Sequence, residues 1–159
     1  MKISMLISCL LLTIVASGQD VKLSSKKILT HDLARVLAEQ AYKEAQKNGW
    51  QVSIAIVDES ADLMFFFKMD EAIPASIELA QAKARSAANF REDGKNLNTA
   101  LSNGSMVLLA IPGMLPLDGG YVLRTVDGEI VGAIGVSGSA AKNDATIALA
   151  AVQYLKQIK

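Results

Sequence analysis

Hydrophobic and polar positions recur with two different periods along the chain, and these periods predict its helices and strands. Apolar residues at helical spacing follow Thr30, a suitable N-cap, and stop at Gly49, so a first helix is predicted between them. A second helix is predicted from Pro74 and a last one from about Ala140, each with alanines along one face. Residues 97–101 are predicted to form a short additional helix. Small residues on a helix face allow close packing on a sheet.

Five segments are predicted to be β-strands because they are apolar or alternate with period two. They are residues 52–58, 63–69, 106–111, 121–126 and 129–136. A short turn joins the first two, and Asp127-Gly128, a strong hairpin signal, joins the last two. Such tight turns imply antiparallel pairing. The predicted fold class is therefore α+β, with a central five-stranded antiparallel sheet flanked by helices.

The first 18 residues differ from everything that follows. Lys2 precedes a short apolar run, and small residues end that run at Gly18, which is the pattern of a secretory signal peptide. We therefore predict cleavage near Gly18 and a secreted or periplasmic protein, with residues 19–29 as an N-terminal arm and residues 30–159 as one domain. The only cysteine, Cys9, lies within the signal, so no disulfide is expected in the mature protein.

The charge of the chain limits its partners. It has 16 basic and 16 acidic side chains, and the basic ones do not gather along one face. Nucleic-acid binding normally needs a basic field, so a nucleic-acid partner is not expected. The apolar run of residues 1–18 is too short to span a bilayer comfortably, which favours a cleaved signal over a membrane anchor. No membrane span is expected after cleavage. A small molecule is the expected partner.

Glycines punctuate the segment that leads into the last predicted helix. Their spacing, Gly132, Gly135 and Gly138, is not the G-x-G-x-x-G of a dinucleotide-binding unit, and a hairpin precedes them. Glycine inside a strand indicates a bulge or the close approach of a helix or ligand. Gly138 and Ser139 introduce the last helix, where exposed amides can receive a carboxylate or phosphate, or where Ser139 simply caps the helix.

Three motifs resemble the GlcG/HbpS family, whose domain also occurs at the C-terminus of PduO-type proteins. They are GEIVGAIGVSGSAAKND, AIVDESADLMFFFKMDEAIPASIELAQAKARSAANF and IPGMLPLDGGYVLRTVDGEIVG, and the resemblance covers about residues 29–155. It implies a profilin-like fold, binding of heme or a related tetrapyrrole, and assembly into homo-oligomers. The run Phe65, Phe66 and Phe67 places an aromatic side chain on each face of the predicted sheet, which also favours a homo-oligomer.

A heme site requires an iron ligand. His31 is the sole histidine and the candidate metal ligand, since imidazole is the commonest protein ligand of heme iron. The tyrosines Tyr42, Tyr121 and Tyr154, or a methionine, are alternative ligands. An exposed histidine without a role in binding is the remaining alternative.

The propionates of a heme require cationic partners. Arg85, Arg91 and Lys83 lie in the helix that resembles the family, and guanidinium pairs bidentately with carboxylate. Ordinary solvated surface cations are the alternative for these residues. Gly119 and Gly120 end the glycine-rich loop 112–120, which is predicted to border a ligand pocket or a subunit contact. The predicted cofactor-binding set is completed by His31, Gly138 and Ser139.

Residues for catalysis are not evident. The chain has no G-x-S-x-G nucleophile elbow and no metal-site spacing of histidine with glutamate, so catalytic residues stay unassigned. We predict a secreted or periplasmic heme- or tetrapyrrole-binding protein that senses or handles its ligand. A small-molecule enzyme, including one that degrades tetrapyrroles, and an oligomeric interaction module are the alternatives.

Overall fold

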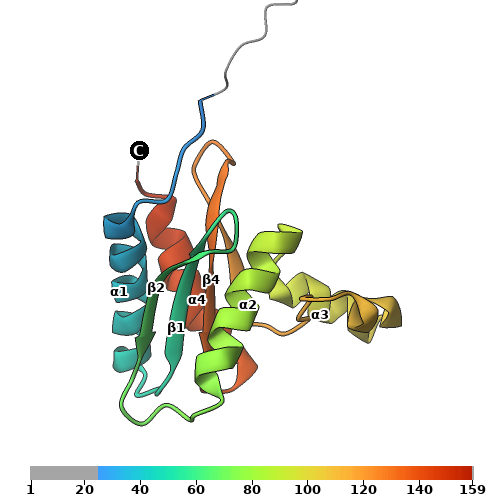
Figure 1. Cartoon of the computed structure of the whole chain (residues 1–159). Coiled ribbons are helices and arrows are strands. Elements are labelled where there is room, and N and C mark those ends of the chain that lie inside the picture. Colours follow the sequence, from blue (N-terminus) through green and yellow to red (C-terminus); the bar gives the residue numbers. More distant parts are fainter. Residues whose placement is uncertain (1–24, 159) are drawn as a thin grey trace, which may run out of the picture.

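The computed structural model describes residues 25–158, which form an α+β domain (Figure 1). The predicted signal peptide and the first part of the N-terminal arm lie outside these residues. The elements in chain order are α1 His31–Lys47, β1 Ser53–Asp58, β2 Leu63–Lys68, α2 Ser76–Phe90, α3 Gly94–Ser102, a 3-10 helix η1 Met106–Ala110, β3 Gly120–Arg124, β4 Ile130–Ser137 and α4 Ala141–Leu155.

The strands form an antiparallel sheet in the order β2-β1-β4-β3. Both predicted hairpins are confirmed: β1 pairs with β2, and β3 pairs with β4. The first strands of the two hairpins do not meet; instead β1 pairs with β4, so that these two strands occupy the centre. The outer edges of the sheet are therefore β2 and β3.

Helices cover both faces of this sheet (Figure 1). On one face α1 and α4 enclose the larger part of the core, which includes Leu37, Ile54, Ile134 and Ile147. On the other face α2 packs against small residues, and its own contribution is a row of alanines. The alanine faces predicted for α2 and α4 are therefore the faces that they bury.

Gly135 allows α2 to lie close to the sheet. A Cβ atom added there would stand 2.0 Å from the carbonyl oxygen of Ala80 and 2.5 Å from the amide nitrogen of Ala84. The backbone of the helix thus occupies the space that a side chain on β4 would need. This is the close helix approach that the glycine pattern indicated, and a larger residue here would force α2 away from β4.

The predicted third strand, residues 106–111, is wrong. Residues Met106–Ala110 form a 3-10 helix, so the sheet has four strands and not five among the described residues. Together α3 and η1 form an arm that projects from the body of the domain (Figure 1). A short apolar run does not distinguish a strand from a helix. The profilin-like assignment of the fold stays a prediction.

The neighbouring sheet edge explains why no strand forms there. The amide of Val122 in β3 donates to Oδ1 of Asp93 at 2.9 Å, at the start of α3. An outward-facing amide that already has an acceptor is not available to a fifth strand. The side chains of Met106, Val107 and Leu109 are instead 59–68% exposed on the arm.

Candidate functional site

The structure distributes the predicted binding residues over three places. His31 begins α1 on one face of the sheet. Arg85 lies in α2, on the opposite face, and Arg91 follows that helix as its C-cap. The other five residues lie around the start of α4 and around the buried Lys83. They are Lys83, Gly119, Gly120, Gly138 and Ser139.

Lys83 belongs to a buried ion pair that sequence reasoning missed. Its Nζ atom donates to Oδ2 of Asp144 at 2.8 Å and to the carbonyl oxygen of Val136 at 2.9 Å. The side chains of Lys83 and Asp144 are 4% and 2% exposed. The pair therefore connects α2, β4 and α4 in the interior of the domain.

A carboxylate of the chain itself, that of Asp144, accepts a backbone hydrogen bond at the start of α4. The amide of Ser139 donates to Oδ1 of Asp144 at 3.1 Å, and the hydroxyl of Ser139 accepts from the Asn143 side chain. A negative charge in the first turn of a helix also interacts favourably with the helix dipole. Burial raises the pKa of the Asp144 carboxyl, and the bonds from Lys83 and Ser139 act in the opposite direction.

Gly119 and Gly120 let the preceding loop pass over Lys83. A Cβ atom on Gly120 would stand 2.6 Å from the carbonyl oxygen of Lys83, and Gly119 has φ +99° and lies close to both Asp144 and the Lys83 ammonium. Gly120 is thus required by the close approach of the α2 backbone, and Gly119 by its positive φ and by the buried ion pair. The carboxylate that completes this cluster, Asp144, is 61 residues from Lys83. No local sequence signal connects them.

The two arginines of the predicted site are exposed. Arg91 ends α2 in the left-handed conformation, with φ 53°, and its carbonyl oxygen accepts from Nη2 of Arg124 at 3.0 Å. Arg85 lies one turn before the end of the helix on its solvent side. Both therefore face solvent on the α2 side of the sheet, across the sheet from His31.

Two grooves follow the outer side of α1 and β2. The one that we call the edge groove has a volume of about 280 Å³. It is lined by Arg35, Ala38, Glu39, Tyr42, Phe65 and Phe67. The second, the end groove, has a volume of about 370 Å³. It is lined by Tyr42, Gln46, Gly49, Gln51, Phe67, Lys68, Met69 and Asp70.

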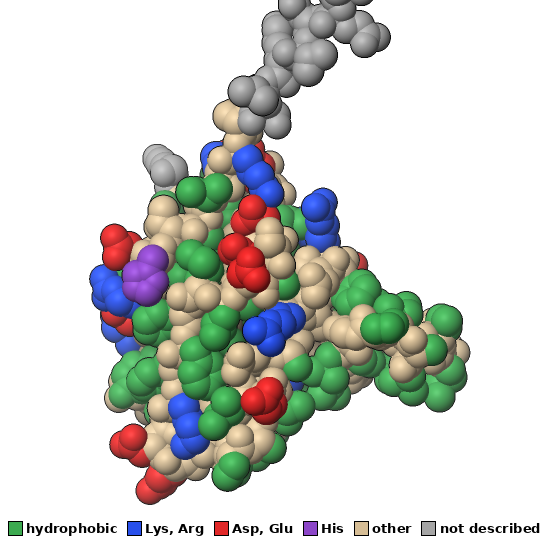
Figure 2. All heavy atoms as spheres, viewed as in Figure 1, with side chains coloured by type: hydrophobic (Ala, Val, Ile, Leu, Met, Phe, Trp, Pro, Cys, Tyr) green, Lys and Arg blue, Asp and Glu red, His purple; other side chains and the backbone are tan. Residues whose placement is uncertain are grey.

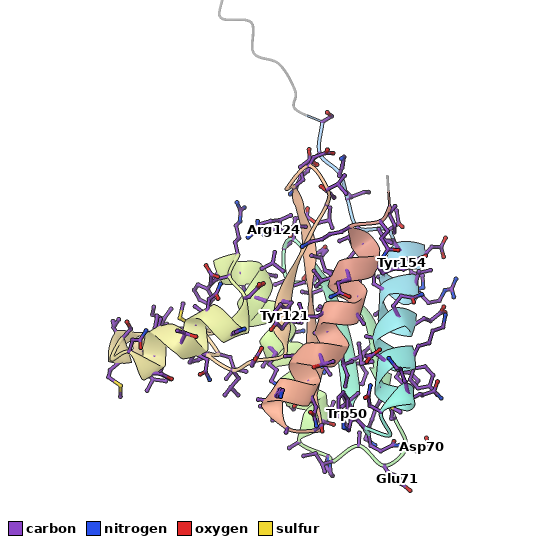
Figure 3. The ribbon with its side chains drawn as sticks, turned by 180° about the vertical axis from the view of Figure 1, so that it is seen from behind. Trp50, Asp70, Glu71, Tyr121, Arg124 and Tyr154 are labelled. Atoms are coloured by element: carbon purple, nitrogen blue, oxygen red, sulfur yellow. The ribbon has the colours of Figure 1, made fainter. Side chains whose placement is uncertain are left out.

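Tyr42 and Phe67 separate the two grooves and line both. Their rings meet edge to face with centroids 4.9 Å apart, a favourable aromatic arrangement. Figure 3 shows Asp70 and Glu71 on the loop after β2, at the end of the molecule opposite Arg124. The edge groove is thus an aromatic surface, and the end groove adds polar side chains to it.

His31 stands beside the edge groove. Its ring centroid lies 6.2 Å from that of Phe65, at an interplanar angle of 52°. Figure 2 shows this histidine, in purple, on the molecular surface. An accessible imidazole next to Phe65 and Phe67 offers a metal ligand beside an aromatic wall, which suits a planar apolar ligand that carries a metal. The sequence predicts that the α1 residues of the groove share one helix face. It does not predict that this face packs beside β2.

Other classes of site find less support in the described part of the chain. Between residues 25 and 158, no three His, Cys, Asp or Glu side chains gather as a metal-ion site. None of the helices in that range is long and apolar enough to cross a membrane.

Comparison with known proteins places this arrangement in a family. The family described as "Haem degrading protein HbpS-like" matches residues 29–153. The chain belongs to the HbpS-like family. The predicted GlcG/HbpS resemblance is therefore confirmed. GlcG of Escherichia coli strain K12 is 37% identical over 115 residues, which are 72% of this chain and 85% of that protein.

Two solved structures share the fold. A double mutant of Streptomyces reticuli HbpS is 30% identical, with a TM-score of 0.75, over 90% of this chain and 96% of that one. The structure of a PduOC:heme complex is 26% identical, with a TM-score of 0.72, over 80% of this chain and 94% of that one. The PduOC structure is a complex with heme, and the family description names haem degradation.

Proposed function

We propose that this protein binds heme or a related tetrapyrrole in the edge groove. The observation that carries the proposal is the accessible imidazole of His31 beside the aromatic wall of Phe65 and Phe67. Family membership and the PduOC:heme complex, a structural relative, support the same ligand class.

The residues of the groove fit such a ligand. Phe65, Phe67 and Tyr42 offer apolar surface for a porphyrin ring, and His31 offers a neutral nitrogen ligand. Arg35 lines the same groove, where its guanidinium can pair with a propionate in place of its present partner Glu39. When bound, an iron porphyrin supplies redox and gas-binding chemistry, while these side chains hold and orient it.

Hemin titration of the wild-type protein tests the proposal. We expect a saturable Soret band that stays with the protein through gel filtration, and a displaced, weaker band for His31→Ala. The double variant Arg85→Ala/Arg91→Ala is the matched comparison, because it removes two cations from the opposite face of the sheet. If that variant alone weakens binding, the ligand lies on α2, as the sequence motif indicated. If wild type gives no saturable change, heme binding is refuted.

We also propose that the protein is exported and that it senses or handles heme outside the cytoplasm. The charged, apolar and small-residue regions of residues 1–18 support export. N-terminal sequencing of secreted material tests this, and a chain that still begins at Met1 contradicts it.

Degradation of the ligand is a second candidate function. The family description, which names haem degradation, favours it. The bound hemin would be incubated with a reductant and dioxygen, with an equal concentration of free hemin as control. Faster loss of the Soret band with protein, accompanied by a chromatographically distinct product, supports an enzyme. Equal or slower loss supports binding alone.

We further propose that the protein forms a homo-oligomer. The half-exposed aromatic run of β2, at the outer edge of the sheet, supports self-association.

A further inference from the structure

The outer edge of β2 presents backbone groups that no strand of the described chain covers. The amide of Met69 donates to the carbonyl oxygen of Val52, and Phe67 pairs with Ile54. Because backbone directions alternate along an antiparallel strand, the N–H and C=O groups of Phe66 and Lys68 point away from β1. These four groups form a short template for another strand.

The opposite edge of the sheet differs. There the amide of Val122 already donates to Asp93 at 2.9 Å, and α3 begins directly after Asp93. Of the two sheet edges, β2 is therefore the one available for pairing.

We propose that β2 pairs antiparallel with β2 of a second copy of this chain, about a two-fold axis at Phe67. This register uses the regular part of the strand, because the pairing with β1 shifts between Ile56 and Val57. It places Phe66 opposite Lys68 of the second copy and Phe67 opposite its own counterpart. Four new backbone hydrogen bonds follow, from the outward groups of Phe66 and Lys68 in each copy.

The side chains of β2 are compatible with this pairing. Phe67 meets Phe67 in a non-hydrogen-bonded pair, where side chains are closest and aromatic pairs are stabilising. No like charges face each other, because Lys68 lies opposite Phe66. The Lys68 ammonium donates to the carbonyl oxygens of Met69 and Asp70 in its own copy, and these bonds keep it solvated at the strand end.

The pairing also completes a ligand site. Phe67 lies between the edge groove and the end groove, so the two-fold axis places the edge groove of one copy against the end groove of the other. Each combined cavity then has the aromatic wall and Arg35 of one copy and the Gln46 and Gln51 side chains of the other. It suits a planar apolar ligand with acidic substituents; this part of the inference rests on the proposed function.

Charge substitutions at Phe66 test the pairing in the full chain by sedimentation velocity. Phe66→Lys places a lysine opposite Lys68 of the second copy, and we expect it to dissociate the dimer. Phe66→Glu removes the same aromatic ring but places a carboxylate opposite that lysine, so it should remain dimeric. Phe66→Lys/Lys68→Glu should restore the dimer. Far-UV circular dichroism checks that each variant is folded. A monomeric wild type, or a Phe66→Lys variant as dimeric as Phe66→Glu, overturns the proposal.

A cross-link tests the register independently of these charges. In a Cys9→Ser background, Phe67→Cys places two thiols at a pair with Cα atoms about 4.5 Å apart, within disulfide range. Leu109→Cys, on the exposed arm, is the control. Oxidation should give a covalent dimer only for Phe67→Cys. A covalent dimer only for Leu109→Cys assigns self-association to the arm and overturns the pairing of β2.

Hemin titration separates the proposal of heme binding from the proposal that β2 pairs between two copies. If both hold, Phe66→Lys binds hemin about tenfold more weakly than Phe66→Glu, since each cavity loses half of its lining. If the charge and cross-linking results hold but wild type binds no hemin, the dimer stands and the proposed function fails. If hemin binds equally to both variants, the shared cavity is refuted.

Discussion

The ammonium nitrogen of Lys83 lies 2.8 Å from the carboxylate of Asp144, and both side chains are almost fully buried. Removing two charges from water is costly, and it is tolerated only when each charge is paired and hydrogen-bonded. Here the amide of Ser139 and the carbonyl of Val136 complete the bonding. The pair connects α2 to α4 through the end of β4, across the sheet that separates them.

Lys83→Met should therefore destabilise the protein by about 3–5 kcal/mol, because it leaves the Asp144 carboxylate buried without a cation. The double variant Lys83→Met/Asp144→Leu should recover much of this loss, since neither charge then remains. Urea unfolding measures both values. Lys26→Ala is the control, because Lys26 pairs with Glu59 at the surface and its loss should cost less than about 1 kcal/mol. A Lys83 variant no less stable than this control contradicts the assignment.

Gly135→Ala should destabilise the protein by about 3 kcal/mol, because the new methyl group overlaps the α2 backbone, which must then move away from β4. Thermal unfolding checks this. Gly104→Ala is the comparison: at φ +96° it has no neighbour within 4 Å, so only backbone strain of about 1 kcal/mol is expected. Equal losses for the two variants would show that steric overlap with α2 is not the cause.

Tyr121 should make the protein sensitive to alkaline pH. Figure 3 shows this residue on β3, where its hydroxyl donates to Asp118 at 2.9 Å. Burial, followed by the hydrogen bond to Asp118, raises the pKa of the Tyr121 phenol well above its usual range. The unfolded phenol therefore loses its proton first as the pH rises, so folding stability falls above about pH 10, the pKa of an unperturbed tyrosine.

Tyr121→Phe removes the phenol whose raised pKa makes folding stability depend on alkaline pH. Near neutral pH it should cost about 1 kcal/mol through the lost hydrogen bond. Between about pH 8 and about pH 11 its free energy of unfolding should fall less steeply than that of wild type. Urea unfolding at the two pH values measures the slopes. Parallel slopes for the two proteins would refute the role of this phenol.

Asp93 should protect the β3 edge from pairing. Asp93→Ala removes the acceptor of the Val122 amide, so we expect higher-order association in size-exclusion chromatography. Asp93→Asn keeps a carbonyl oxygen at the same position and should behave as wild type. Association in both variants would indicate that the carboxylate charge, rather than the hydrogen bond, protects this edge.

Much of the fold could be predicted from residues that act locally. Thr30 caps α1 as expected, with its hydroxyl accepting from the amide of Leu33, and Asp127-Gly128 forms the turn of the last hairpin. The failure at residues 106–111 has a physical cause. An apolar run predicts burial, but these residues lie on a projecting arm, where the side chains of Met106, Val107 and Leu109 are exposed.

The candidate site was harder to predict because it depends on distant contacts. His31 was identified as a possible ligand from its chemistry, yet its neighbour Phe65 comes from a strand that only the fold brings to α1. Lys83 was grouped with Arg85 and Arg91 because they share a helix. A helix has several faces, and this one turns Lys83 inward while Arg85 faces solvent.

The hydrogen bond between Val122 and Asp93 limits how far the molecule can assemble through its sheet. A sheet with two available edges can add copies at both ends and grow into a fibre. Because Asp93 satisfies one edge, each copy has a single surface for strand addition, and a two-fold pairing consumes it in both partners. Assembly by this route stops at two chains. The aromatic strand that is exposed in the monomer therefore leads to a dimer and not to a polymer.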